Sequence, residues 1–185
     1  MLPTERFNHF ISQNDLFSHH DRVLAAVSGG MDSVLMAHLF KAAGFNFGIA
    51  HCNFQLRGKD ADADQQFVQE LASQLNVPFH TINFDTRAYA ADKKISIQMA
   101  ARDLRYQWFQ KISQQSGYAY IALAHHQNDG IETILLNLTR GTGIAGMHGI
   151  LPKNGKLVRP LLFLNREEIA DIIESNGLAY VEDSS

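Results

Sequence analysis

Short continuous apolar runs alternate along this chain with longer segments in which apolar residues recur at helical spacing. The runs lie at residues 22–27, 45–50, 79–84 and 118–124. A continuous apolar run is typical of a strand that is buried on both faces of a parallel sheet. Because helical segments separate the runs, the pattern predicts an α/β domain with a Rossmann-like parallel sheet and helices on both faces.

The helical segments are bounded by glycine, by proline or by capping residues. They are predicted at residues 4–18, 33–43, 60–76, 96–115, 129–139 and 165–175. The glycine-rich stretch 141–156 is predicted as loop, and 180–181 as a short strand. The 185 residues are expected to form one domain, 1–185, with residues 1–20 as a lead-in helix.

In such a fold the ligand binds beyond the carboxyl ends of the strands, so the loops after the apolar runs are the candidate sites. The first of these loops reads Ser28-Gly29-Gly30-Met31-Asp32-Ser33. Two glycines permit a sharp turn and close backbone approach, and a helix N-terminus favours phosphate. The Ser28 and Ser33 hydroxyls can donate to phosphate oxygens, whereas Asp32 is expected to bind Mg²⁺. The alternative is a plain turn with a serine cap.

Three further groups follow the other runs. His51 is expected either to contact a nucleotide or to cap its strand. Arg102 and Arg105 are three residues apart on a helix, which suits an anionic ligand, although a solvated face is the alternative. Asp129 and Glu132 share one side of a helix start, where they could orient or deprotonate an amine. Carboxylates are also favoured there by the helix dipole alone.

Composition excludes several classes of protein. Cys52 is the only cysteine, which excludes an intrachain disulfide and a cysteine-only metal or iron–sulfur site. Zinc bound by Cys52, His125 and His126 is disfavoured by their spacing, and the Gly141–Gly146 fingerprint for a dinucleotide follows a helix rather than a strand. We see no signal peptide and no membrane span, so the cytoplasm is expected. The net charge of −3 gives no global basic signature for nucleic acid.

The Ser28–Ser33 loop resembles the signature of the N-type ATP pyrophosphatases, which have an adenine nucleotide alpha hydrolase-like fold. Further blocks, in the same order, resemble the tRNA(Ile)-lysidine synthetase family. These blocks are His51-Cys-Asn-Phe-Gln-Leu-Arg57-Gly, Ala-Ala-Arg102-Asp-Leu-Arg105-Tyr, Ala-His125-His126-Gln-Asn-Asp129-Gly-Ile-Glu132-Thr, Arg140-Gly-Thr-Gly, Arg159-Pro-Leu-Leu and Tyr180-Val-Glu-Asp-Ser-Ser. The family usually carries two aspartates and a glutamine where this chain has Asn128, Asp129 and Gly130.

The resemblance implies an N-terminal ATP-pyrophosphatase catalytic domain, which in that family is followed by C-terminal tRNA-binding domains. It implies ATP held by residues 28–33 and His51, with Mg²⁺ on Asp32. The wobble cytidine of an isoleucine tRNA would be adenylated at its C2 oxygen, with Arg102 and Arg105 stabilising charge. Free L-lysine would then displace AMP to form lysidine, changing the codon from AUG to AUA.

In that reaction Asp129 and Glu132 are implied to hold or deprotonate the lysine. A homodimer is left open. Two alternatives to this function also remain open at this point. One is a tRNA cytidine 2-thiolation enzyme of the same superfamily, and the other is a non-catalytic sensor that binds ATP. An NAD or GMP synthetase fits the arginine and His-His blocks less well.

Overall fold

A six-stranded sheet in the order β3-β2-β1-β4-β6-β5 forms the centre of the computed structural model, which describes residues 1–56, 58–132 and 149–182. All neighbouring strands are parallel except β5 and β6. The strands are β1 (Arg22–Ala26), β2 (Asn46–Asn53), β3 (Phe79–Asn83), β4 (Tyr120–Ala122), β5 (Lys153–Asn154) and β6 (Leu157–Val158). The helices are α1 (Thr4–Gln13), α2 (Met31–Ala42), α3 (Lys59–Leu75), α4 (Thr86–Lys93), α5 (Ile97–Ser116) and α7 (Arg166–Ser175).

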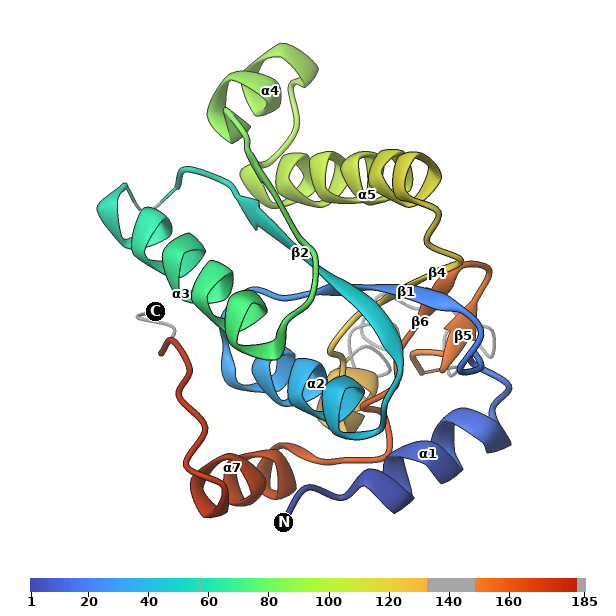
Figure 1. Ribbon diagram of the computed structural model, residues 1–185. Helices are drawn as coiled ribbons and strands as arrows, with labels where there is room; N and C mark the ends of the chain where they lie inside the picture. The colour runs from blue at the N-terminus through green and yellow to red at the C-terminus, as the bar shows by residue number, and fades with distance from the viewer. Residues whose placement is uncertain (57, 133–148, 183–185) are drawn as a thin grey trace.

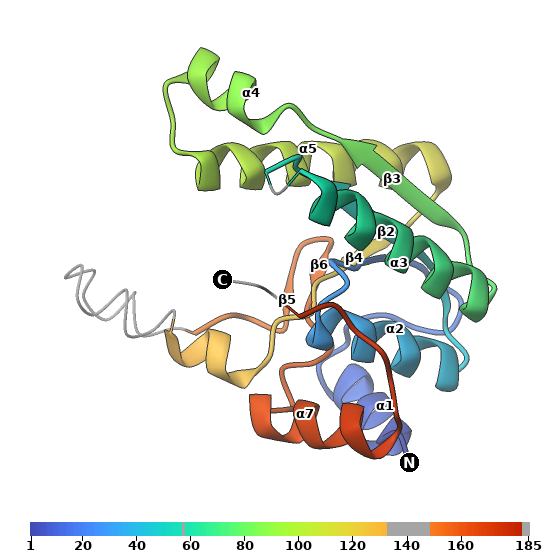
Figure 2. The same cartoon turned by 90° about the vertical axis from the view of Figure 1, so that its left-hand side faces the viewer.

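The chain order explains why helices cover both faces of the sheet. From β1 it moves outward through α2 to β2 and through α3 to β3, and then returns through α5 to β4 on the other side of β1. Right-handed crossovers place α2 and α3 on one face and α5 on the opposite face. Figures 1 and 2 show α5 on one side of the sheet, with α2, α1 and α7 on the other. The predicted α/β class with a mainly parallel sheet is confirmed.

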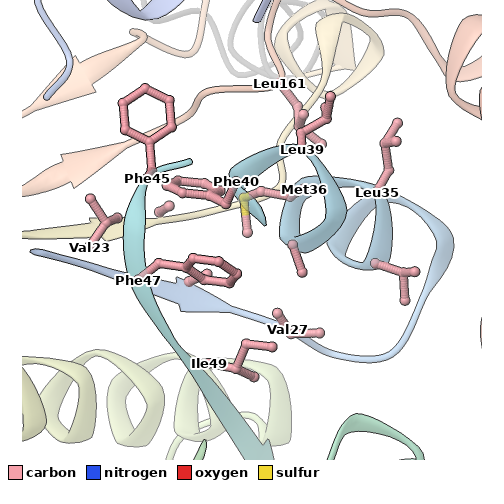
Figure 3. Close-up of a cluster of buried hydrophobic side chains, with 14 of the residues drawn as sticks. Val23, Val27, Leu35, Met36, Leu39, Phe40, Phe45, Phe47, Ile49 and Leu161 are labelled. Atoms are coloured by element: carbon pink, nitrogen blue, oxygen red, sulfur yellow. The ribbon is translucent and has the colours of Figure 1, made fainter. Parts of the chain in front are cut away.

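The sheet separates two hydrophobic clusters, and β1 contributes to both. Val23 and Ala25 belong to the larger cluster with α1, α2, α3 and α7, whereas Leu24 belongs to the smaller cluster with α5. Successive side chains of a strand point to opposite faces, so a strand with apolar residues at every position must be covered on both sides. Figure 3 shows side chains of α2, among them Leu35 and Met36, packed against the sheet.

Aromatic side chains attach the lead-in helix to the domain. Phe7 of α1 lies with its ring centroid 5.6 Å from that of Phe40 on α2, in an edge-to-face contact. Phe17 stacks on the same ring at 5.3 Å and meets Phe45 edge-on at 5.1 Å. Such pairs add to the stability gained from burial. The predicted lead-in helix is therefore part of the core, although it ends at Gln13 rather than at residue 18.

Three elements, α4, β5 and β6, were not predicted from the sequence. Helix α4 begins at a cap in which the Asp85 side chain accepts a hydrogen bond from the Ala88 N–H at 2.9 Å. The β5–β6 hairpin lies partly in the stretch that was predicted as loop, and its β6 strand extends the sheet beyond β4. Residues 180–181 are not in a strand, contrary to the prediction. In the part of the chain that the structure describes, no helix combines the length and apolar character that crossing a membrane requires.

A polar contact crosses the sheet where α5 returns to β4. The Tyr118 hydroxyl lies 2.9 Å from Nε2 of His80, and the Arg22 guanidinium sits 4.5 Å from the centre of the Tyr118 ring. This arrangement needs a glycine at position 48 of β2, since a Cβ there would lie 2.9 Å from Cζ of Tyr118 and closer still to its hydroxyl oxygen.

We therefore expect Gly48→Ala to reduce the free energy of unfolding by about 2 kcal/mol through overpacking. Adding Tyr118→Phe removes the closest clashing atom, so the double variant should recover part of that loss. Denaturant unfolding of the four proteins in this double-mutant cycle measures the effect. Strictly additive losses would show that Gly48 and Tyr118 are not coupled in this way.

Candidate functional site

A cleft of about 830 Å³ opens beyond the carboxyl ends of β1 and β4. These neighbouring strands are where the chain changes direction across the sheet, because α2 leaves β1 on one face and α5 enters β4 from the other. A crevice forms at such a switch point. Its described lining comprises residues 26–28, 30–33, 50, 52, 54, 105, 109, 123–126, 128, 129, 132, 166 and 180–182. The cleft therefore brings together the first predicted loop, Arg105, Asp129 and Glu132.

The hydroxyl of Ser33 holds the glycine loop in shape. It accepts hydrogen bonds from the N–H groups of Ser28 and Gly29 at 3.1 and 3.2 Å, and it donates to the Gly30 carbonyl at 2.9 Å. One proton and two lone pairs are all that a serine hydroxyl offers. Ser33 thus holds the loop itself, and Ser28, whose Oγ accepts from the Gly30 N–H at 3.3 Å and lies 3.2 Å from Ser33 Oγ, lines the cleft together with Ser33.

The two glycines of the loop meet different constraints. Gly29 has φ = +103°, a conformation that L side chains rarely adopt, and a Cβ there would lie 3.3 Å from Cγ2 of Val181. The Gly29 carbonyl also accepts a hydrogen bond from the Val181 N–H at 2.9 Å. Gly30 has φ = −69° and caps α2, and an added Cβ would meet only Ser28 Oγ at 3.5 Å. Of the two, only Gly29 requires the absence of a side chain.

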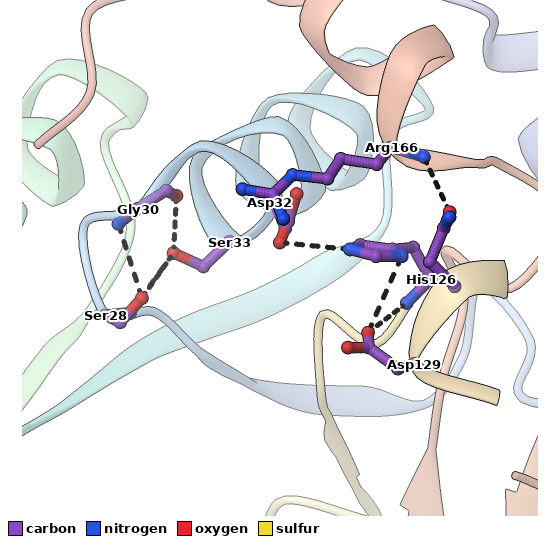
Figure 4. Close-up of polar contacts among 8 residues, drawn as sticks. Ser28, Gly30, Asp32, Ser33, His126, Asp129 and Arg166 are labelled. Atoms are coloured by element: carbon purple, nitrogen blue, oxygen red, sulfur yellow. Dashed lines mark hydrogen bonds and ion pairs between the residues drawn. The ribbon is translucent and has the colours of Figure 1, made fainter. Parts of the chain in front are cut away.

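A buried histidine lies between the carboxylates of the two loops. Nε2 of His126 is 3.7 Å from Oδ2 of Asp32, and its Nδ1 is 3.7 Å from Oδ2 of Asp129. Figure 4 shows this row of three side chains, with Asp32 at the start of α2. His126 thereby connects the candidate metal ligand to the candidate amine-binding carboxylate. The sequence had suggested His126 only as a weak zinc ligand, because its position between two loops depends on the fold.

Asp129 also shapes the loop that carries it. Its Oδ2 accepts the His126 backbone N–H at 2.8 Å, at the start of a helix that begins at residue 127 and is described to residue 132. This is the backbone contact of the carboxylate in a capping box, and it agrees with the alternative that a carboxylate is favoured at a helix start. Its neighbour Asn128 accepts the backbone N–H of Arg166 at 3.0 Å and so joins this helix to the start of α7. Glu132 lines the cleft with an exposed side chain.

Arg166 is a site residue that the sequence did not single out. It is the first residue of α7 and lines the cleft. Figure 4 shows its side chain extending from α7 toward Asp32. A cation at this position can balance carboxylates or bind phosphate oxygens bidentately. The capping box of Asn165 and Glu168 was a readable signal for the start of this helix, but nothing local indicated that α7 faces the cleft.

The two arginines of α5 occupy different surroundings. Arg105 lines the cleft, and its guanidinium lies 5.2 Å from the centre of the Phe54 ring. Arg102 is exposed, lies 5.0 Å from the centre of the Tyr106 ring and is not among the described lining residues. Both still act on the cleft electrostatically, because both lower the pKa of His125. The helix therefore brings one arginine to the cleft wall and holds the other nearby.

His51 and Cys52 lie beneath the loop at the end of β2. Nδ1 of His51 lies 2.9 Å from the Val27 carbonyl, and because a carbonyl only accepts, Nδ1 carries the proton. Burial lowers the pKa of His51. The side chain is buried and is not among the described lining residues, so the geometry favours the strand-anchoring alternative over nucleotide contact. Burial raises the pKa of Cys52 to about 12, although Arg105 opposes the shift, so the thiol is protonated at neutral pH.

The donor set fits a magnesium ion shared with phosphate better than a closed metal cage. Among the described residues, no group of three or more His, Cys, Asp and Glu side chains is arranged to hold a metal. Mg²⁺ keeps several waters and commonly uses one or two carboxylates together with substrate phosphates, which Asp32 could share. Four of the candidates from the sequence lie outside the described residues. They are Arg57, Arg140, the glycines of residues 141–146 and the end of the Tyr180–Ser185 block.

The loop geometry predicts that Gly29→Ala is far more damaging than Gly30→Ala. An alanine at position 29 must adopt a left-handed conformation and press on Val181, which should cost about 1–2 kcal/mol of stability. The matched variant Gly30→Ala should fold normally. Thermal unfolding, together with fluorescence titration using a labelled ATP, compares the two variants. Equal losses in both variants would contradict the asymmetry.

Comparison with known proteins identifies a family that matches nearly the whole chain. The model of the ATP-binding PP-loop domain matches residues 3–185. A tRNA(Ile)-lysidine synthase of Bacteroides thetaiotaomicron is 47% identical over 181 residues, which are 98% of this chain and 42% of the relative. One from Chlorobaculum tepidum is 39% identical, over 97% of this chain and 55% of the relative. The chain therefore spans about half, or less, of the length of these curated relatives.

Solved structures of lower identity share the fold. A U34-tRNA thiolase of Methanococcus maripaludis with a [4Fe-4S] cluster superposes with a TM-score of 0.77 at 16% identity, covering 98% of this chain and 66% of that one. An NH3-dependent NAD synthetase of Campylobacter jejuni gives 0.65 at 19%, covering 95% and 72%. The glycine loop after β1, the crevice at the switch point and the match over nearly the whole chain lead to one assignment: this chain belongs to the PP-loop domain family.

Proposed function

We propose that this chain is the catalytic domain of a tRNA(Ile)-lysidine synthase, which uses ATP to join lysine to the wobble cytidine of an isoleucine tRNA. The observation that carries the proposal is the identity of 36–47% to proteins of that name across nearly the whole chain. The cleft supports it, because its lining combines the Ser28–Ser33 loop with the acidic side chains of Asp129 and Glu132 and the basic side chains of Arg105 and Arg166. Since the substrate would be a tRNA, we also expect the reaction to occur in the cytoplasm.

The glycine loop would hold ATP with its α-phosphate toward the cleft. The Ser28 hydroxyl and the N-terminus of α2 would bind phosphate oxygens. A Mg²⁺ ion on Asp32 would neutralise charge on the phosphates. The cytidine C2 oxygen would then attack the α-phosphate and release pyrophosphate, which leaves the base activated as an adenylate. Arg105, with Arg102 behind it, would stabilise the anionic oxygens during this step.

The second step would use the carboxylates beyond β4. Asp129 and Glu132 both line the cleft, which suits a positively charged amino acid. One of them would accept the proton that the lysine amine must lose before its lone pair attacks C2. The bond between C2 and the adenylate oxygen would break, and AMP would leave. The His126 contact to Asp129 and Asp32 would keep the lysine and ATP subsites in register.

The two alternative functions are less well supported by the site. A thiolation enzyme needs a nucleophilic or metal-bound sulfur, whereas Cys52 is the only cysteine and burial holds its thiol in the protonated form. A non-catalytic sensor needs ATP binding but not the acidic side chains that face the loop from the far side of the cleft. We therefore keep lysine ligation as the proposed function.

Replacing Asp32 tests the adenylation step. We expect Asp32→Ala to lower tRNA-dependent exchange between ATP and pyrophosphate on the order of 100-fold or more, because phosphate charge is no longer balanced. The matched control is Asp103→Ala, an exposed carboxylate on α5 that is not among the described cleft-lining residues. Exchange at the wild-type rate in Asp32→Ala would remove the proposed role of Asp32. ATP binding without any exchange in the wild type would favour a sensor.

Replacing Cys52 separates the ligase from the thiolation alternative. We expect Cys52→Ala to fold and to form the lysine adduct at a rate within a few-fold of wild type, since no step uses the sulfur. Mass spectrometry of nucleosides from the reacted tRNA identifies the product. Loss of all product in a folded Cys52→Ala protein, or a cytidine that has gained sulfur in the wild-type reaction, would contradict the proposed chemistry.

A further inference from the structure

The parallel pair β4–β6 places two side chains together that are 34 residues apart in sequence. Ala122 pairs with Val158, and the Leu123 N–H donates to the Val158 carbonyl at 2.9 Å. The chain segments that leave the two strands therefore run side by side. As a result, Nε of Arg159 lies 3.2 Å from Nδ1 of His125 and donates a hydrogen bond to it.

This contact fixes the position of the proton on the His125 ring. A guanidinium has only donors and stays protonated in proteins, so Nδ1 of His125 must be the acceptor. A neutral imidazole that accepts at Nδ1 carries its proton on Nε2. Burial is the main cause that lowers the pKa of His125, and Arg159, Arg102 and Arg105 lower it further, against the opposing effect of Asp129. The ring is thus held neutral, with one nitrogen as acceptor and the other as donor.

Arg159 is itself held firmly and away from the ligand space. Its Nη1 donates to the Leu151 carbonyl at 2.7 Å, and its backbone N–H donates to the Pro152 carbonyl at 2.8 Å. His125 lines the cleft, but Arg159 is not among the described lining residues. Arg159 therefore meets a bound ligand through the histidine ring rather than by direct contact.

The surroundings of His125 indicate what its Nε2–H would meet in the cleft. Three arginines act on the ring electrostatically, and Arg105 shares the cleft wall with it. Such a group of cations suits an anionic oxygen. We propose that Arg159 is a positioning residue that holds His125 as the Nε2–H tautomer, so that His125 donates a hydrogen bond to a phosphate oxygen in the cleft. Only the source of that phosphate, ATP or tRNA, rests on the proposed function.

A second histidine provides an internal reference for testing the tautomer. His51 donates from Nδ1 to the Val27 carbonyl, so it carries its proton on the nitrogen opposite to that of His125. Nitrogen-15 spectra that correlate ring nitrogens with ring protons distinguish the two forms. In the wild-type protein without substrates, we expect His125 to be protonated at Nε2 and His51 at Nδ1.

The Arg159→Ala variant should release this constraint. We expect its His125 signals to shift toward a mixture of tautomers, while the His51 signals stay unchanged and report an intact fold. Arg159→Lys keeps the charge but lacks the Nε donor, so it should shift His125 in the same direction. A wild-type His125 protonated at Nδ1, or His125 signals unaffected in both variants, would overturn the tautomer assignment whatever reaction the protein performs.

Activity then tests the donor role of Nε2. Glutamine places an amide N–H near the position of Nε2, whereas asparagine mimics Nδ1. We expect His125→Gln to retain most of the exchange activity and His125→Asn to lose about 100-fold, as when a single anion-binding donor is removed. Arg159→Ala should lose roughly tenfold on its own, as expected for a residue that orients a functional histidine. It should lose little more in the His125→Gln background, because the amide needs no tautomer.

The kinetic constants identify which phosphate is bound. A weaker Kd for labelled ATP in His125→Asn indicates an ATP phosphate, and a raised KM for tRNA with unchanged ATP affinity indicates a tRNA phosphate. Equal activity of the Gln and Asn variants, or fully additive losses with Arg159→Ala, would overturn the positioning role. If the wild-type protein shows the expected nitrogen-15 signals but no exchange between ATP and pyrophosphate, the result counts against the proposed function and not against the tautomer of His125.

Discussion

The parallel pairing of β1 with β4 is the constraint on which the rest of the site depends. The Ser28–Ser33 loop follows β1, and the His125–Glu132 segment follows β4, and the register that pairs Ala25 with Ala122 brings both to one edge. Helix α2 leaves β1 on one face of the sheet and α5 enters β4 from the other, and a cleft opens beyond the ends of these two strands. The same logic extends one strand further, where the β4–β6 pairing sets Arg159 beside His125. The ends of β1 and β4 thus bring the Ser28–Ser33 loop, Asp129 and Glu132 to one cleft, and the end of β6 sets Arg159 against His125 of its lining.

Acidic and basic side chains both line this cleft. Asp32, His126 and Asp129 form a row in which the histidine separates two carboxylates that would otherwise repel each other. Arg105 and Arg166 line the same space. For the proposed reaction this combination of charges is useful, because ATP and a tRNA bring negative charge whereas lysine brings positive charge. The phosphates would meet the arginines and the lysine would meet Asp129, while the buried His126 ring lies between Asp129 and Asp32.

Much of the architecture could be predicted because it is encoded locally. The continuous apolar runs identified all four main strands, and the glycine loop between the first run and its helix indicated where a phosphate would bind. Helix α4 was missed because its eight residues show no apolar stripe, although Asp85 caps its start. The strands β5 and β6 are two residues each, too short to show a period. Arg166 became a candidate only in the fold, and only the fold gave His126 and Arg159 their contacts, because the partners of all three are distant in sequence. His51 was read as a nucleotide contact or a strand cap, and only the Val27 carbonyl distinguishes the two.

The proposed function requires that this cleft join an amine to an activated tRNA base with the cleavage of ATP. The most direct measurement follows unmodified isoleucine tRNA with α-labelled ATP, with and without lysine, and analyses the nucleosides by mass spectrometry. We expect an adenylated cytidine when lysine is omitted, and AMP release with formation of a lysine–cytidine adduct when lysine is present. Ornithine, which is shorter by one methylene, should give far less product. Release of AMP that is independent of tRNA, with no mass added to cytidine under either condition, would contradict the proposed function.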